Sequence, residues 1–152
     1  MQITSDQQLD DESLSLVQKA EAALSGAYAP YSGFQVAAAL LLDDGAVLTG
    51  TNQENAAYPL CMCAERVALY AKTSLHPNRS IIRLAVVAKR SGAAALVPAT
   101  PCGSCRQVMS EFESRQNHPI EVVMLTSEQG WMKLPSAQSL LPFSFGSSNL
   151  LD

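Results

Sequence analysis

Hydrophobic residues recur along the chain with two different spacings. Over residues 10–25 they lie three or four positions apart, the spacing that places them on one face of a helix. This apolar face comprises Leu14, Val17, Ala20 and Leu24. Asp10 or Asp11 can cap the start of the helix, and Gly26 follows its end. We therefore expect a helix that packs its apolar face on a sheet.

Elsewhere the apolar residues form short runs that are typical of strands. Residues 36–42 and 46–53 are two such segments, and the tight-turn sequence Asp43-Asp44-Gly45 separates them. Together they predict an antiparallel hairpin. Three further strands are predicted at residues 83–89, 120–125 and 130–134, the last as an edge strand.

Two more helices are predicted among these strands. One runs from Cys63 to about Thr73, and the other runs from Cys102 to Glu111 or Phe112. Strands that alternate with helices favour an α/β fold, here a three-layer α/β/α sandwich around a five-stranded mixed sheet. A chain of 152 residues suits a single domain, which we expect to span residues 1–152.

The composition narrows the classes of partner. The chain is 47% hydrophobic and 16% charged, which is typical of a folded domain. A net charge of −4 with only 10 lysines and arginines argues against binding to nucleic acid. Residues 1–12 lack the basic and apolar regions of a signal peptide, and no apolar run approaches the roughly 18 residues of a membrane span. We expect a cytoplasmic protein without a membrane partner.

Three cysteines and a glutamate form the strongest chemical motif. Cys102 and Cys105 have the Cys-x-x-Cys spacing, so one turn can present two thiolates to a metal ion. Cys63 would supply a third thiolate and leave one tetrahedral position open for water, as in catalytic zinc sites. Glu65 is placed to move protons at that water. Because Cys63 and Cys102 both begin predicted helices, we expect two helix starts to converge on one ion.

The motif resembles that of the zinc deaminases, whose conserved glutamate is not a metal ligand. More of the chain, from about Tyr28 to Leu150, resembles the cytidine deaminases, specifically the small homotetrameric branch with three cysteine ligands. The matching segments are Tyr28–Phe34, Asn52–Pro59, Cys63–Arg66, Pro101–Val108, and Leu140–Pro142 with Phe145-Gly146.

This resemblance implies hydrolytic deamination of cytidine and 2'-deoxycytidine to uridine and 2'-deoxyuridine in pyrimidine salvage. It implies one Zn²⁺ per chain, held by Cys63, Cys102 and Cys105. Zinc-bound hydroxide would attack C4 of the cytosine ring, and Glu65 would shuttle the protons. In the three-cysteine branch the arginine matching Arg66 contacts a ligand thiolate and offsets the negative charge of the site.

The resemblance also assigns the substrate contacts. Phe34 would line the pocket against the flat pyrimidine, and Ala64 would also contact the substrate. Asn52 and Glu54 would hold the ribose. From the residues alone, a polar strand end beside a loop is the favoured interpretation of this pair on one strand face. Phe145 would reach into a neighbouring subunit of a homotetramer.

Two positions depart from the family pattern. Gln53 stands where the family usually has an aliphatic residue, and Ser147 stands where it usually has proline.

Two alternatives keep some of these residues but change the function. Cys61 could join the other three cysteines in a closed structural zinc site without catalysis, which leaves Glu65, Asn52 and Glu54 unexplained. A deaminase of another cytosine-containing small molecule, similar to the blasticidin deaminases, would share the zinc core but not the Asn-x-Glu-Asn run that begins at Asn52.

Overall fold

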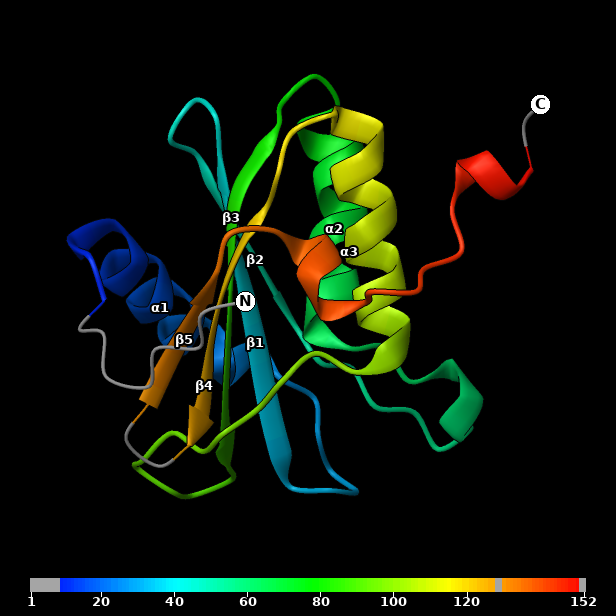
Figure 1. Ribbon diagram of the computed structural model, residues 1–152. Helices are drawn as coiled ribbons and strands as arrows, with labels where there is room; N and C mark the ends of the chain where they lie inside the picture. Colours follow the sequence, from blue (N-terminus) through cyan, green and yellow to red (C-terminus); the bar gives the residue numbers. More distant parts are fainter. Residues whose placement is uncertain (1–8, 128–129, 151–152) are drawn as a thin grey trace.

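A five-stranded mixed sheet forms the centre of the computed structural model, which describes residues 9–127 and 130–150 (Figure 1). The strand order is β2-β1-β3-β4-β5. Only β3 and β4 pair in parallel; the other neighbours are antiparallel. The strands are β1 (Phe34–Leu42), β2 (Val47–Thr51), β3 (Ile81–Arg90), β4 (Glu121–Ser127) and β5 (Gly130–Leu134). The predicted mixed sheet of five strands is therefore confirmed.

Helices cover both faces of this sheet. Helix α1 (Asp11–Ala23) lies on one face, and helices α2 (Ala64–Leu75) and α3 (Gly103–Gln116) lie side by side on the other (Figure 1). This arrangement is the predicted three-layer sandwich. Short 3₁₀ segments are η1 (Leu24–Gly26), η2 (Tyr58–Leu60), η3 (Ala137–Leu140) and η4 (Ser147–Asn149). Within the described residues, no helix is long and apolar enough to cross a bilayer.

The two faces of the sheet build two hydrophobic clusters. On β1, Ala38 and Leu40 face α2 and α3, whereas Ala37 and Ala39 face α1. Because successive side chains of a strand point to opposite faces, a strand covered on both sides is apolar at every position. This double burial explains the continuous hydrophobic run of β1.

Helix α1 shows one error in the predicted apolar face. Asp10 caps the helix, accepting a hydrogen bond from the Ser13 backbone N–H at 2.7 Å. Val17, Ala20 and Leu24 are buried as predicted, but Leu14 is 45% exposed. Leu16 and Ser13 occupy the buried face instead, so the predicted contribution of Leu14 to that face is wrong.

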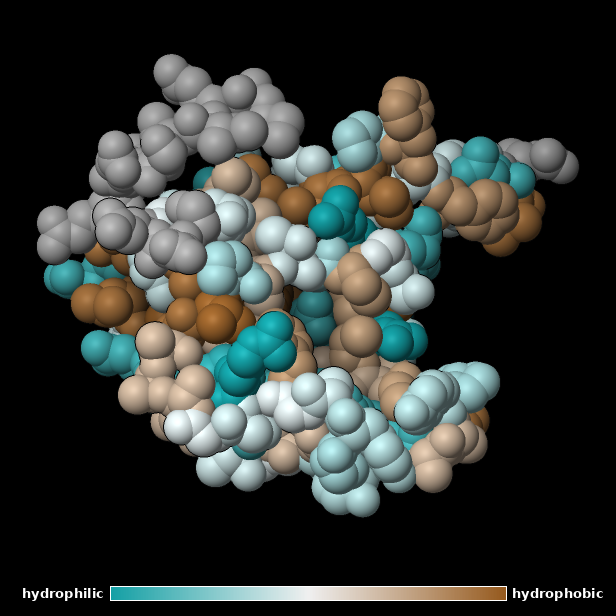
Figure 2. All heavy atoms as spheres, turned by 90° about the horizontal axis from the view of Figure 1, so that it is seen from below, coloured by the Kyte–Doolittle hydropathy of each residue, from teal (hydrophilic) through white to brown (hydrophobic). Residues whose placement is uncertain are grey.

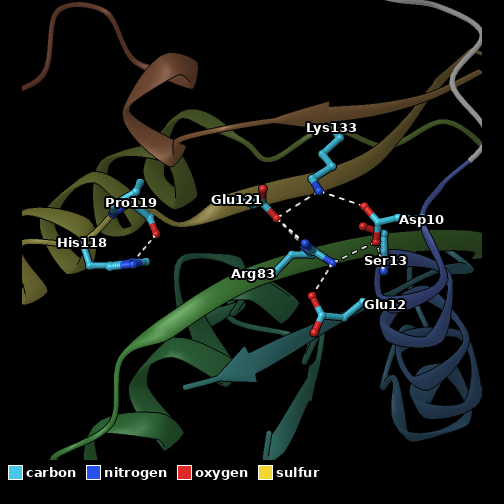
Figure 3. Close-up of polar contacts among 8 residues, drawn as sticks. All are labelled: Asp10, Glu12, Ser13, Arg83, His118, Pro119, Glu121 and Lys133. Carbon is cyan, nitrogen blue, oxygen red and sulfur yellow. Dashed lines mark hydrogen bonds and ion pairs between the residues drawn. The ribbon is translucent and has the colours of Figure 1, made fainter. Parts of the chain in front are cut away.

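A cluster of ion pairs connects the start of α1 to strands β3, β4 and β5 of the sheet (Figure 3). The Arg83 side chain on β3 is only 7% exposed and contacts Asp10, Glu12 and Glu121. Lys133 on β5 contacts Asp10 at 2.9 Å and Glu121 at 3.2 Å. Lys133 and the bonds to Ser13 lower the pKa of Asp10, so its carboxylate stays charged. This cluster lies away from the cysteine motif and has a structural role.

Close packing at Gly50 holds α2 against β2. A Cβ atom at this position would lie 2.5 Å from the Ala68 nitrogen and 2.7 Å from the Ala64 oxygen, both in the backbone of α2. Real Cβ atoms essentially never approach other atoms that closely. The absence of a side chain at Gly50 therefore sets the position of the first turn of α2, which carries Glu65.

Candidate active site

Three sulfur atoms converge where α2 and α3 begin. Cys63 is the N-cap residue of α2, Cys102 is the N-cap residue of α3, and Cys105 lies in the first turn of α3. The three Sγ atoms all lie within 4.8 Å of one another, and those of Cys63 and Cys102 are 3.8 Å apart. Two sulfurs at about 2.3 Å from a tetrahedral zinc ion would be about 3.8 Å apart. The sulfur triad therefore fits a zinc ion, and two helix starts converge as predicted.

Cys61 is engaged elsewhere. Its Sγ accepts a hydrogen bond from the Asn55 N–H at 3.3 Å and lies 3.6 Å from the Asn55 carbonyl oxygen. In residues 9–127 and 130–150, the one group of ligand atoms with metal-binding spacing is the triad of Cys63, Cys102 and Cys105. This arrangement does not favour a closed site with four cysteines.

The Cys63 and Cys105 thiols of the triad have pKa values shifted in opposite directions. The hydrogen bond from the Cys105 thiol, followed by that from Arg66, lowers the pKa of Cys63. The same hydrogen bond to Cys63 and burial raise the pKa of Cys105. Arg66 Nη2 donates to Cys63 Sγ at 3.6 Å, while its buried Nε has no hydrogen-bond partner among residues 9–127 and 130–150. The positive charge of Arg66 thus lies directly beside a sulfur of the triad, a contact that the family resemblance implies.

Glu65 occupies the first turn of α2, beside the sulfur triad. Its side chain is almost fully enclosed, with 4% of the residue exposed. Burial raises the pKa of Glu65, and the charge of Cys63 raises it further. A carboxyl group in this environment can exchange a proton closer to neutral pH than an exposed glutamate.

A cavity of about 280 Å³ joins the triad to most of the predicted substrate residues. Cys63, Cys102 and Glu65 line one part of it. The predicted substrate contacts in its lining are Phe34, Asn52, Glu54 and Ala64. The structure therefore brings these residues, distant in the sequence, to one hollow.

Some lining residues were missed by sequence reasoning. Val36 and Val86, from the neighbouring strands β1 and β3, line the cavity, and Ala99 and Thr100 also contribute to it. Thr100 precedes the Pro101-Cys102 segment directly, so its place in the sequence was an available signal. The valines belong to buried runs, in which nothing distinguishes a cavity residue from a core residue.

Asn52 lies just beyond β2, which ends at Thr51 and not at residue 53 as predicted. Asn52 Oδ1 accepts a hydrogen bond from the Val36 N–H at 2.9 Å, and Asn52 Nδ2 donates to the Phe34 oxygen at 2.9 Å. The side chain thus continues the pairing with β1. One Nδ2 hydrogen and one Oδ1 lone pair remain for another partner.

Glu54 is bound by the loop before β1. Its Oε2 accepts hydrogen bonds from the backbone N–H groups of Tyr31 at 2.9 Å and Ser32 at 3.3 Å. Its Oε1 accepts one from Ser32 Oγ at 2.5 Å. The bond from Ser32 Oγ, followed by that from Tyr31, lowers the pKa of Glu54. Glu54 is therefore a charged acceptor at neutral pH.

Phe145 does not line this cavity. It lies on the C-terminal tail and is 59% exposed, and its carbonyl oxygen accepts a hydrogen bond from Gln107 Nε2 at 2.6 Å. With Tyr70 and Val108 it borders a separate hollow of about 410 Å³ over α2 and α3. The tail leads away from the body of the molecule (Figure 1).

Comparisons with known proteins agree with this geometry. The family model described as the cytidine and deoxycytidylate deaminase zinc-binding region matches residues 10–118. Cytidine deaminase of Halalkalibacterium halodurans is 42% identical over 137 residues, 90% of this chain and 96% of that protein. Cytidine deaminase of Sporosarcina psychrophila is 41% identical over 135 residues, 89% of this chain and 92% of that protein.

The fold has the same relatives. The crystal structure of cytidine deaminase from Burkholderia pseudomallei aligns with a TM-score of 0.73 and 40% identity, over 90% of this chain and all of that one. Cytidine deaminase from Mycobacterium tuberculosis aligns with a TM-score of 0.69 and 34% identity, over 90% of this chain and 99% of that one. Sequence, fold and sulfur triad thus lead to one conclusion: the chain belongs to the zinc-binding family of cytidine and deoxycytidylate deaminases.

Proposed function

We propose that this protein converts cytidine and 2'-deoxycytidine, with water, to uridine and 2'-deoxyuridine and ammonia. The observation that carries the proposal is the 280 Å³ cavity, which joins a zinc-compatible sulfur triad and a buried carboxyl group to polar groups suited to a sugar. Pyrimidine salvage in the cytoplasm is the setting that suits this reaction. The net charge of −4 favours small nucleosides over nucleic acids as substrates.

Cys63, Cys102 and Cys105 would hold the zinc. When bound, zinc supplies a water molecule acidic enough to act as a nucleophile near neutral pH. Three thiolates oppose this effect through their negative charge. Arg66 beside Cys63 and the positive ends of α2 and α3 offset that charge, which is how this chain keeps a sulfur-rich site catalytic.

Glu65 is the group of this chain that would move protons. Its carboxylate would accept one proton from the attacking water and deliver it to N3 of the cytosine ring. It would then accept the second proton, from the new hydroxyl at C4, and pass it to the amine, which leaves as ammonia when the C4–N bond breaks and the C4 carbonyl forms. Enclosure by the cavity wall raises its pKa, which suits a group that must both take up and release a proton.

The remaining cavity residues would bind and orient the nucleoside. The Phe34 ring provides an apolar surface for the pyrimidine, and Ala64 lines the cavity at the start of α2. Asn52 offers one donor and one acceptor, and Glu54 offers an acceptor. These donors and acceptors are suited to a sugar hydroxyl. Free cytosine has no sugar, so it would lack the hydroxyl groups through which the nucleoside is oriented.

A substrate panel tests the proposal. The purified protein is incubated with cytidine, deoxycytidine, free cytosine and CMP, and loss of the 4-amino chromophore is followed. We expect turnover of both nucleosides and none of free cytosine. Turnover of free cytosine at the rate of cytidine would remove the sugar assignment, and a protein inactive on both nucleosides would refute the proposed activity.

We also propose a homotetramer in which Phe145 contributes to the active site of a neighbouring subunit. Apolar side chains exposed on the tail and on the loop around η2 support it: Tyr58, Leu60, Phe143, Phe145 and Leu150. Figure 2 shows a notch between these two projections. A monomer would leave this apolar surface in water, at a cost in free energy.

Mass and complementation test the assembly. Light scattering should give about four times the chain mass of 16.2 kDa. Mixing inactive Glu65→Gln chains with Phe145→Ala chains should restore some activity, because a hybrid site combines an intact Glu65 with the neighbour's Phe145. A fully active monomer would exclude the shared site.

A further inference from the structure

Ser32 connects two of the residues that we assign to the nucleoside. Its hydroxyl donates a hydrogen bond to Glu54 Oε1 at 2.5 Å and accepts one from the Phe34 N–H at 3.0 Å. Glu54 and Phe34 both line the catalytic cavity, whereas Ser32 is not among its lining residues. Ser32 therefore supports the cavity from outside.

The remaining acceptor position of Glu54 depends on this hydroxyl. A carboxylate has about four acceptor positions, two on each oxygen. The backbone N–H groups of Tyr31 and Ser32 occupy Oε2, and Ser32 Oγ occupies one position on Oε1. The position left is on Oε1. Because rotation about the bond to a carboxylate is soft, the bond from Ser32 Oγ, together with the two backbone bonds to Oε2, sets where this position points.

The loop that carries Ser32 has its own backbone anchors. The Tyr28 N–H donates to the Asn52 oxygen at 3.0 Å, and the Glu54 N–H donates to the Tyr28 oxygen at 2.8 Å. Gly33 adopts a φ of 62°, which favours glycine, and its carbonyl accepts from the Ser91 N–H at 2.8 Å. The loop can therefore keep its course when the Ser32 hydroxyl is removed.

We propose that Ser32 is a positioning residue for the sugar of the nucleoside: its hydroxyl orients the Glu54 carboxylate and links it to the backbone of Phe34. The proposal rests on the function proposed above, in which Glu54 accepts a hydrogen bond from a sugar hydroxyl. Ser32 lies outside the cavity lining and outside the sulfur triad, so we expect it to act on nucleoside binding and to leave the chemical step unchanged.

Removing one hydroxyl tests this role. We expect Ser32→Ala to raise the KM for cytidine by about tenfold, the effect of one hydrogen bond to a charged group, while kcat stays within about twofold. Ser32→Thr, which keeps the hydroxyl, should restore the KM. Thr51→Val is the matched control: Thr51 Oγ1 also donates one hydrogen bond, to Gly26, and accepts one, from Gln53, but does not touch Glu54. Its KM should stay at the parent value.

A double-mutant cycle separates this proposal from the sugar assignment. If Ser32 acts through Glu54, adding Ser32→Ala to Glu54→Ala should leave the KM of the single Glu54→Ala variant unchanged. An additional tenfold rise in the double variant would overturn the proposal, and so would a normal KM for Ser32→Ala when Glu54→Ala alone raises it. A normal KM for Glu54→Ala would instead refute the proposed sugar site itself. Thermal unfolding of each variant, expected close to that of the parent, excludes a loss of the fold.

Discussion

The carboxyl group of Glu65 combines enclosure with proximity to the sulfur triad. It is held by the first turn of a helix whose N-cap residue is Cys63, so the helix fixes the group and a sulfur together. Glu65 is not one of the three residues of the sulfur triad. Its charge and its proton can therefore be removed without removing a zinc ligand.

Glu65→Gln should keep the fold and its zinc but lose turnover. The amide has nearly the same shape as the carboxyl group but cannot carry the proton, so we expect kcat to fall by at least about 10²-fold. Steady-state kinetics with cytidine and elemental analysis of the same preparation measure both effects. A zinc-loaded variant with near-normal turnover would show that another group moves the proton.

The four cysteines should differ in their effect on zinc content. Cys61→Ser should retain one zinc per chain, because Cys61 contacts Asn55 and lies outside the sulfur triad. Cys63→Ser, Cys102→Ser and Cys105→Ser should each lose zinc. Elemental analysis of the four variants measures their zinc content. Loss of zinc from Cys61→Ser would favour the alternative of a closed structural site with four cysteine ligands.

Arg83 contributes stability at a distance from the active site. Its buried guanidinium lies among three carboxylates, which would face one another without it. Because those carboxylates are partly exposed, we expect Arg83→Met to lower the free energy of unfolding by about 1–3 kcal/mol, less than for a fully buried pair. Urea denaturation measures the change. Arg90→Met, on the same strand but exposed, should change it by less than about 0.5 kcal/mol.

At the scale of elements, the succession of strands and helices along the chain could be predicted. Strands buried on both faces and amphipathic helices each leave a clear pattern of hydrophobic residues in the sequence. The prediction misplaced ends that depend on contacts distant in the sequence. Strand β2 stops at Thr51 because the Asn52 side chain takes over the pairing with β1. Helix α3 runs to Gln116, beyond the predicted end at Glu111 or Phe112, and Asn117 ends it with a φ of 51°. Asn117, two residues before Pro119, is a recognisable signal for the end of this helix.

The candidate active site shows the same difference between features with a local sequence pattern and features that depend on distant contacts. Cysteine spacing and the position of Glu65 identified the chemistry, since both are local to two short segments. The bond between Ser32 and Glu54 spans 22 positions and has no local pattern. The fold was needed to show that the Gln53 side chain donates hydrogen bonds to the Gly26 oxygen and to Thr51 Oγ1, and that Gln53 also lines the catalytic cavity.

The contact between α2 and β2 can be tested at Gly50. Gly50→Ala places a methyl group against the α2 backbone, so the helix must move away from the sheet. We expect a loss of about 1–3 kcal/mol in the free energy of unfolding, the usual cost of overpacking, together with lower activity. Urea denaturation and the cytidine assay measure these effects. Gly26→Ala is the control, because its new methyl group would meet only ordinary contacts at 3.6 Å and 3.7 Å.

At the scale of the whole molecule, zinc should stabilise the fold as well as serve the reaction. A ligand that binds only the native state raises its stability in proportion to the logarithm of its concentration over its dissociation constant. Chelation should therefore lower the Tm of the parent protein, and added zinc should restore it. The Tm of Cys102→Ser should not respond to the chelator, and a parent Tm unaffected by complete zinc removal would contradict the expectation.

The N-cap positions of Cys63 and Cys102 give zinc retention a second use. These residues are 39 positions apart in the chain, and only the packing of α2 beside α3 brings their sulfurs to 3.8 Å. In an unfolded chain, Cys102 and Cys105 are the two triad cysteines that stay close to each other, and Cys63 is separated from both. Retention of zinc therefore indicates that the native tertiary structure has formed. In each variant that keeps Cys63, Cys102 and Cys105, metal analysis can check folding before the kinetics are interpreted.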